Sequence, residues 1–91
     1  MSRGESMIIY ALRYALGRRT YAVSDVCDHI RTYQKHLSNE CIENIIRDIN
    51  RELKHYHDMG MTLGDTFDEQ DWIQLRDVLA VELALRGEKH G

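Results

Sequence analysis

The clearest periodic pattern in the chain lies in residues 38–59, SNECIENIIRDINRELKHYHDM. Its apolar residues recur mainly at intervals of three and four, which is the spacing of one helix face. Strict alternation fails, so the isoleucines indicate a helix rather than a strand. Ser38 can cap the helix at its start, and Gly60 can end it, so we expect a helix over residues 39–59. The predicted stripe comprises Ile42, Ile45, Ile46, Ile49, Leu53 and Tyr56.

The segment before it, Met7 to Leu16, reads MIIYALRYAL and is apolar on nearly every side. Arg13 is its only charge, which is typical of a helix that is central in a bundle or shared with a partner. Gly17 follows as a candidate left-handed C-terminal cap. We therefore expect a first, central helix over residues 5–16.

Two further helices complete the predicted fold, over residues 24–36 and 68–86. Ser24 is the expected cap of the former, whose apolar face comprises Val26, Ile30, Tyr33 and Leu37. Thr66 with Glu69 forms a candidate capping box for the latter, and Asp68 is the competing cap. The last helix carries the apolar residues Trp72, Leu75, Val78, Leu79, Leu83 and Leu85. The chain has no proline, so the sequence predicts an all-α fold, a compact bundle of about four helices.

Length and composition favour one small domain. The chain has 91 residues, of which 43% are hydrophobic and 30% charged, and a net charge of -3. Residues 1–37 hold six basic and three acidic residues, whereas residues 38–91 hold six and twelve, so the halves have opposite net charge. Such a chain can attract a charged partner or another copy of itself, and a homo-oligomer would stabilise so small a core.

Several features predict a cytoplasmic protein. No apolar run is long enough for a membrane span or a signal peptide. Cys27 and Cys41 are expected as free, partly buried thiols. Residues 1–6 are a candidate leader, since Arg3-Gly4-Glu5 matches purine-rich codons like those of a ribosome-binding site. Met7 is then the candidate natural start, and a vector-derived remnant is the alternative.

Two clusters of side chains are candidates for binding a partner. One interleaves guanidinium groups, which bind phosphates or carboxylates, with phenol rings that stack on bases or pack against protein. The other sets carboxylates beside aromatic residues and could imitate nucleic-acid phosphates. The alternatives are tyrosines at the edge of the core and acids that cap the last helix. The first cluster comprises Tyr10, Arg13, Tyr14, Arg18, Arg19 and Tyr21, and the second Asp65, Phe67, Asp68, Glu69 and Asp71.

Metal binding and catalysis are not predicted. His55 and His57 are two residues apart and point to different sides of a helix, so they cannot share one metal ion. His55 could meet Asp58, but two ligands are too few. Cys27 and His29 have the same unsuitable spacing. The sequence has no phosphate-binding glycine loop, no paired-carboxylate motif and no nucleophile signature. We expect a protein that is no enzyme and holds no cofactor.

Residues 10–23, YALRYALGRRTYAV, together with Arg47-Asp48-Ile49 and the acidic run from Asp68 to Trp72, resemble small uncharacterised helical proteins of bacteriophages and prophages. The resemblance spans most of the chain. It implies an accessory protein that binds a host protein, as anti-CRISPR and anti-restriction inhibitors do, often as dimers or acidic decoys.

The expected function is therefore protein binding, with inhibition of a host defence nuclease as its sharpest form. One alternative is nucleic-acid binding by a helix-turn-helix-like pair formed by the second and third predicted helices. Against it, the acids Glu40, Glu43, Asp48 and Glu52 make the third helix mixed or acidic on its outer face. Another alternative is a self-assembling module in which Arg18 and Arg19 of one copy contact the acidic loop of the next copy, which carries the cluster from Asp65 to Asp71.

Overall fold

The structure, a computed structural model, describes residues 2–18, 22–58 and 67–88. Within them lie four α-helices and one short 3₁₀ helix, in line with the predicted all-α bundle. The elements are α1 (Arg3–Arg18), α2 (Ala22–Tyr33), the 3₁₀ helix η1 (Gln34–His36), α3 (Asn39–Asp58) and α4 (Phe67–Glu88). No helix in these ranges is long and apolar enough to cross a membrane.

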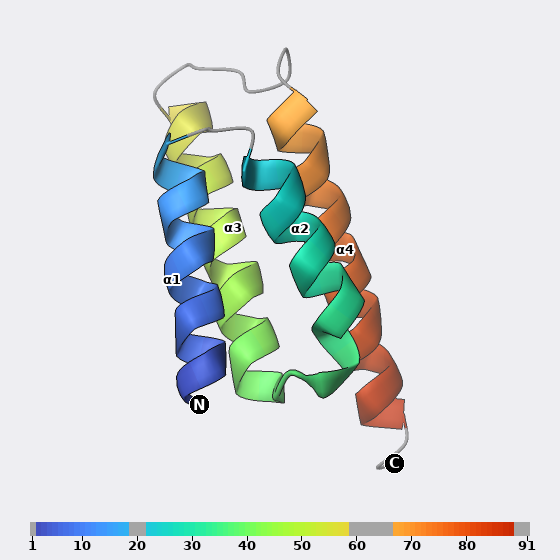
Figure 1. Cartoon of the computed structure of the whole chain (residues 1–91). Helices are drawn as coiled ribbons and strands as arrows, with labels where there is room; N and C mark the ends of the chain where they lie inside the picture. Colours follow the sequence, from blue (N-terminus) through green and yellow to red (C-terminus); the bar gives the residue numbers. More distant parts are fainter. Residues whose placement is uncertain (1, 19–21, 59–66, 89–91) are drawn as a thin grey trace.

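The helices alternate in direction and form two layers, α1 and α2 over α3 and α4 (Figure 1). Helix α1 packs on α2 and α3, and α4 packs on the same two helices from the opposite corner. The expectation that the first helix is central is therefore wrong, because α1 lies at a corner of the bundle and keeps one side facing outward.

The core is built from the stripes expected along the sequence. On α3, Ile42, Ile45 and Ile49 are completely buried and Leu53 nearly so. Leu12, Ile30, Leu75 and Leu79 meet them from the other three helices. Two predicted core residues lie elsewhere, since Tyr33 of α2 and Leu85 of α4 are about half exposed. Tyr56 has no described side chain.

Helix ends agree with the sequence at one cap and differ at three. The Cys41 N–H donates to Ser38 Oγ at 3.2 Å, which confirms Ser38 as the cap of α3. Gly17 does not end α1, since the helix continues to Arg18. Ser24 and Asp68 do not cap either, because α2 begins at Ala22 and α4 at Phe67. Thr66, the other predicted cap of α4, lies outside the described residues.

Arg86 closes the end of the bundle where α2 passes into α3. Its guanidinium donates to the carbonyl oxygens of Leu37 at 2.7 Å and Gln34 at 2.9 Å, and to Asn39 Oδ1 at 2.9 Å. These contacts satisfy carbonyls that a helix end leaves without intrahelical partners. A residue near the end of α4 thus holds the connection between α2 and α3.

The two sides of α1 should respond differently to truncation. Leu12 is completely buried, whereas Met7 is 68% exposed. We expect Leu12→Ala to lower the free energy of unfolding by about 3 kcal/mol, because it leaves a cavity in the core. Met7→Ala should cost below about 0.5 kcal/mol, because solvent already surrounds the side chain in a single chain. Urea denaturation of both variants measures this, and equal losses would contradict the orientation of α1.

Candidate functional site

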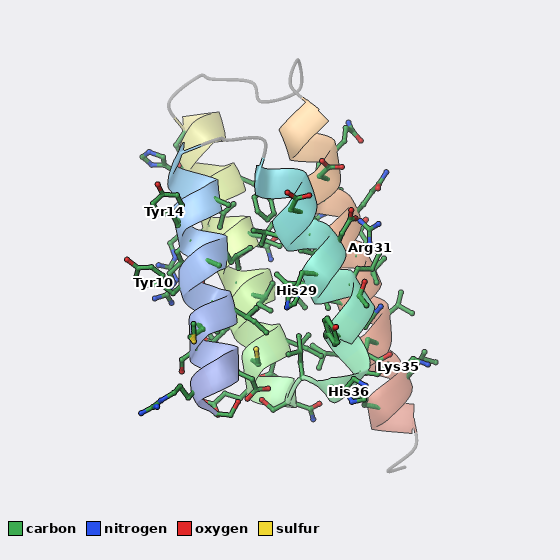
Figure 2. The ribbon with its side chains drawn as sticks, viewed as in Figure 1. Tyr10, Tyr14, His29, Arg31, Lys35 and His36 are labelled. Carbon is green, nitrogen blue, oxygen red and sulfur yellow. The ribbon has the colours of Figure 1, made fainter. Side chains whose placement is uncertain are left out.

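The exposed side of α1 carries a regular apolar stripe. Met7, Tyr10 and Tyr14 follow one another at intervals of three and four residues, and they are 68%, 75% and 51% exposed. We call these three residues the α1 ridge. Figure 2 shows both tyrosines pointing away from the bundle. A helix with this spacing presents one continuous seam to its surroundings, as coiled-coil helices do.

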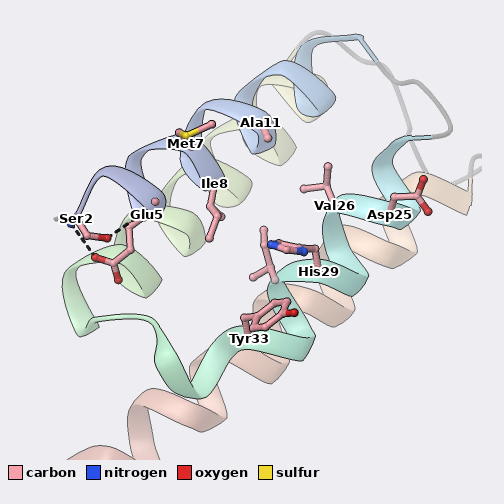
Figure 3. A pocket seen from close by; sticks show the side chains of 11 residues that line it. Ser2, Glu5, Met7, Ile8, Ala11, Asp25, Val26, His29 and Tyr33 are labelled. Carbon is pink, nitrogen blue, oxygen red and sulfur yellow. Dashed lines mark hydrogen bonds between the residues drawn. The ribbon is translucent and has the colours of Figure 1, made fainter.

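A groove runs beside the ridge, between α1 and α2 (Figure 3). It has a volume of about 700 Å³ and is open to solvent along its length. Six of the residues that line it are Met7, Ile8, Ala11, Val26, His29 and Tyr33. We call this hollow the α1–α2 groove. Ridge and groove share Met7 and form one continuous, mainly apolar face.

Small and large side chains together shape the groove. Ala11 is exposed and has only a methyl group, so α1 leaves a gap at this point opposite α2. On the α2 side, the His29 and Tyr33 rings lie 4.8 Å apart between centroids and tilt at 50° to each other. This pair forms an aromatic wall, and Val26 and Ile30 extend the apolar lining along α2.

One end of the groove is fixed by the carboxylate of Glu5. Glu5 Oε1 accepts the Ser2 N–H at 3.2 Å, while Ser2 Oγ accepts the Glu5 N–H at 3.2 Å, which is a capping box for α1. The same carboxylate accepts the Ser38 N–H at 2.6 Å and the Ser38 hydroxyl at 3.2 Å. Glu5 therefore ties the start of α1 to the start of α3. Residues 2–5, expected as part of a leader, take a specific part in this packing.

The carboxylate of Asp48 also holds α1 against α3, nearer the C-terminal end of α1. Asp48 is only 6% exposed, and its Oδ2 accepts from Arg13 Nε at 2.9 Å while its Oδ1 accepts from Arg51 at 3.1 Å. The sequence interpretation placed Asp48 on the outer face of the third helix, and this is wrong. Arg13, expected in the binding cluster, is held towards α3 by this ion pair, although its side chain stays 60% exposed.

The structure brings together only part of the predicted arginine–tyrosine cluster. Tyr10 and Tyr14 stand on one exposed face, and Arg13 lies toward α3. Arg18 ends α1, but its side chain is not described, and Arg19 and Tyr21 lie outside the described residues. For these three residues the binding role stays a prediction.

The predicted acidic cluster lies mostly outside the described side chains. Asp65 is beyond the described ranges, and Phe67, Asp68 and Glu69 form the start of α4 without described side chains. Asp71 is half-buried, and its carbonyl oxygen lies 3.9 Å from Cys27 Sγ. The proposed imitation of nucleic-acid phosphates by this acidic cluster therefore also stays a prediction.

The two cysteines form no disulfide and are buried, at 1% and 0% exposure for Cys27 and Cys41. Burial raises the pKa of the Cys41 thiol to about 11, so at neutral pH it is protonated and a poor nucleophile. Within the described ranges, no three histidine, cysteine, aspartate or glutamate residues are placed to share a metal ion. Among the described features, the α1 ridge and the α1–α2 groove are therefore the strongest candidate site.

Comparison with known proteins found no relative of this chain. No family model matches the chain, and no match was found among curated proteins or solved structures.

The stability that the Glu5 carboxylate gives by binding Ser2 at the start of α1 and Ser38 at the start of α3 should depend on pH. The N–H groups of Ser38 and then Ser2 hold the pKa of Glu5 below its ordinary value of 4.5. The ionised carboxylate thus stabilises the fold above about pH 4.5, and this contribution is lost as the pH falls through the lowered pKa.

We therefore expect wild type to be more stable than Glu5→Gln at neutral pH, and the difference to shrink as the pH drops from about 6 to about 3. Chemical denaturation across this range measures it. Glu43→Gln, which removes one negative charge from exposed α3 surface, is the matched control. A difference between wild type and Glu5→Gln that does not change with pH would contradict the assigned role of Glu5.

Proposed function

We propose that this protein is a binding module that receives a helix of another protein chain across α1 and α2. The observation that carries the proposal is one continuous apolar face, formed by the α1 ridge beside the α1–α2 groove. Side chains as large as Met7 and Tyr10 are seldom left this exposed in a row without a partner to cover them.

The shape of the face favours a helix as the ligand. Helix-in-groove recognition inserts side chains at intervals of three and four residues into an apolar hollow. The groove is lined from Gly4 to Ala11 on α1 and from Asp25 to Tyr33 on α2, so each helix offers about 10 to 12 Å of wall, which equals about two turns of a bound helix. An extended peptide would need free backbone groups to pair with, and helices α1 and α2 already use theirs internally.

The charges of this face favour a protein over a nucleic acid. The groove lining includes the carboxylates of Glu5 and Asp25, and no lysine or arginine. Phosphate groups would be repelled there. Helices α2 and α3 also run antiparallel (Figure 1), whereas the two helices of a helix-turn-helix cross at a large angle. The structure thus offers no support for the nucleic-acid alternative.

Inhibition of a host defence nuclease stays a prediction that rests on the resemblance to phage proteins. A groove that takes a helix is compatible with it, because blocking a partner requires binding and no chemistry at the inhibitor.

A display library of peptides about 20 residues long tests the proposal. We expect the peptides selected by the protein to carry apolar residues at intervals of three and four. Their affinity should fall at least about tenfold for Ala11→Glu, because a charge then occupies the groove. Gln74→Glu, on an exposed position of α4, is the matched control and should bind as wild type does.

Two results would overturn the proposal. One is a selection that yields no helical periodicity. The other is a set of helical peptides that bind Ala11→Glu as tightly as wild type.

A further inference from the structure

We propose that the helix received by this face is α1 of a second copy, so that two chains form a two-fold symmetric dimer. This inference rests on the proposed function and names the partner for the same site. It is carried by self-complementarity, because the chain presents a projecting ridge and a matching hollow side by side on one face.

A two-fold axis requires a surface that fits itself. In such an interface, every contact made by residue i of one copy to residue j of the other occurs twice. The α1 ridge can enter the groove of the second copy while the ridge of that copy enters the first groove. A single two-fold interface then buries both the ridge and the groove of each copy.

Residue spacing sets the register of the pair. The ridge is nearly symmetric about Tyr10, with Met7 three residues before it and Tyr14 four residues after it. In an antiparallel pair, Met7 lies opposite Tyr14 of the second copy, and each Tyr10 lies near the axis. There the Tyr10 ring meets the gap at Ala11, whose methyl group is the smallest side chain in the middle of the groove. A large residue thus faces a small one at the centre, as knobs-into-holes packing needs.

Charge selects the antiparallel arrangement. Arg3 begins α1 at one end of the face, and Asp25, in the first turn of α2, lies at the other end. An antiparallel pair brings Arg3 of each copy toward Asp25 of the other copy. A parallel pair would bring arginine to arginine and aspartate to aspartate, which costs free energy.

The area fits a dimer of moderate strength. Met7, Tyr10, Tyr14 and Tyr33 are 68%, 75%, 51% and 48% exposed, which amounts to about 500 Å² per copy at ~200 Å² for a whole side chain. Complete burial of these four side chains in both copies amounts to about 1,000 Å², the lower bound for a specific interface. We therefore expect a dissociation constant of about 1 to 100 µM.

Sedimentation velocity between about 2 and 500 µM tests the inference. We expect wild type to pass from monomer to dimer over this range. Tyr10→Glu should weaken the dimer at least about 30-fold, because it sets two negative charges together at the axis. Val81→Glu is the matched control, since Val81 is 59% exposed on α4, and it should dimerise as wild type does. Circular dichroism checks that each variant is folded.

The orientation has a separate test. Arg3→Asp and Asp25→Arg should each weaken the dimer, and the double variant Arg3→Asp with Asp25→Arg should restore it to within about threefold of wild type. Lack of rescue would overturn the antiparallel register.

A wild type that stays monomeric at every concentration, or equal weakening by Tyr10→Glu and Val81→Glu, would overturn the dimer. These outcomes differ from failure of the proposed function. If the wild-type monomer still selects helical peptides that Ala11→Glu loses, the face binds a different chain and only the dimer is wrong. If it selects none, both are wrong.

Discussion

The architecture depends on a helix that is apolar on two opposite sides. The inner side of α1 contributes Leu12 and Ala15 to the core, and its outer side carries the α1 ridge. Among the described elements α1 packs mainly on α2 and α3, so this two-layered bundle covers only one of these sides. Burial of apolar surface drives association between chains as it drives folding. The outer side of α1 is therefore the part of the surface with most to gain from a partner.

The position of this face is fixed by charged contacts between α1 and α3. Glu5 joins the first turns of α1 and α3, and Asp48 of α3 holds Arg13 of α1. These two contacts are about two turns of α1 apart, so they hold the helix in both position and rotation. The ridge is consequently preorganised, and a partner would not have to pay the cost of ordering it.

Much of the fold could be predicted from the sequence, because periodicity reports which side of a helix is buried. The isoleucines of residues 42–49 and the cap at Ser38 follow directly from spacing and side-chain chemistry. The end of α1 could not be placed from Gly17, because a glycine is tolerated inside a helix as well as after it. The pattern Ser2-x-x-Glu5 was a detectable capping signal, but it lay in residues interpreted as a leader.

The candidate site was only partly predictable. Tyr10 and Tyr14 were singled out from their place among arginines, and they do lie exposed on one face. The α1–α2 groove was not found, because it arises where α1 and α2 come to lie side by side, and no local pattern reports which helices become neighbours. For the same reason Asp48 was placed on the surface, since its partner Arg13 is 35 residues away in the chain.

The most direct test of the outward face of α1 is an isotope-filtered nuclear Overhauser experiment on a mixture of labelled and unlabelled chains. We expect contacts between copies from the Tyr10 ring to the Ala11 methyl group and from Met7 to Tyr14. Contacts between copies that involve Val81 and Leu85 of α4 instead, or none at concentrations of several hundred micromolar, where a dimer of the expected affinity would form, would contradict burial of this face by a second chain.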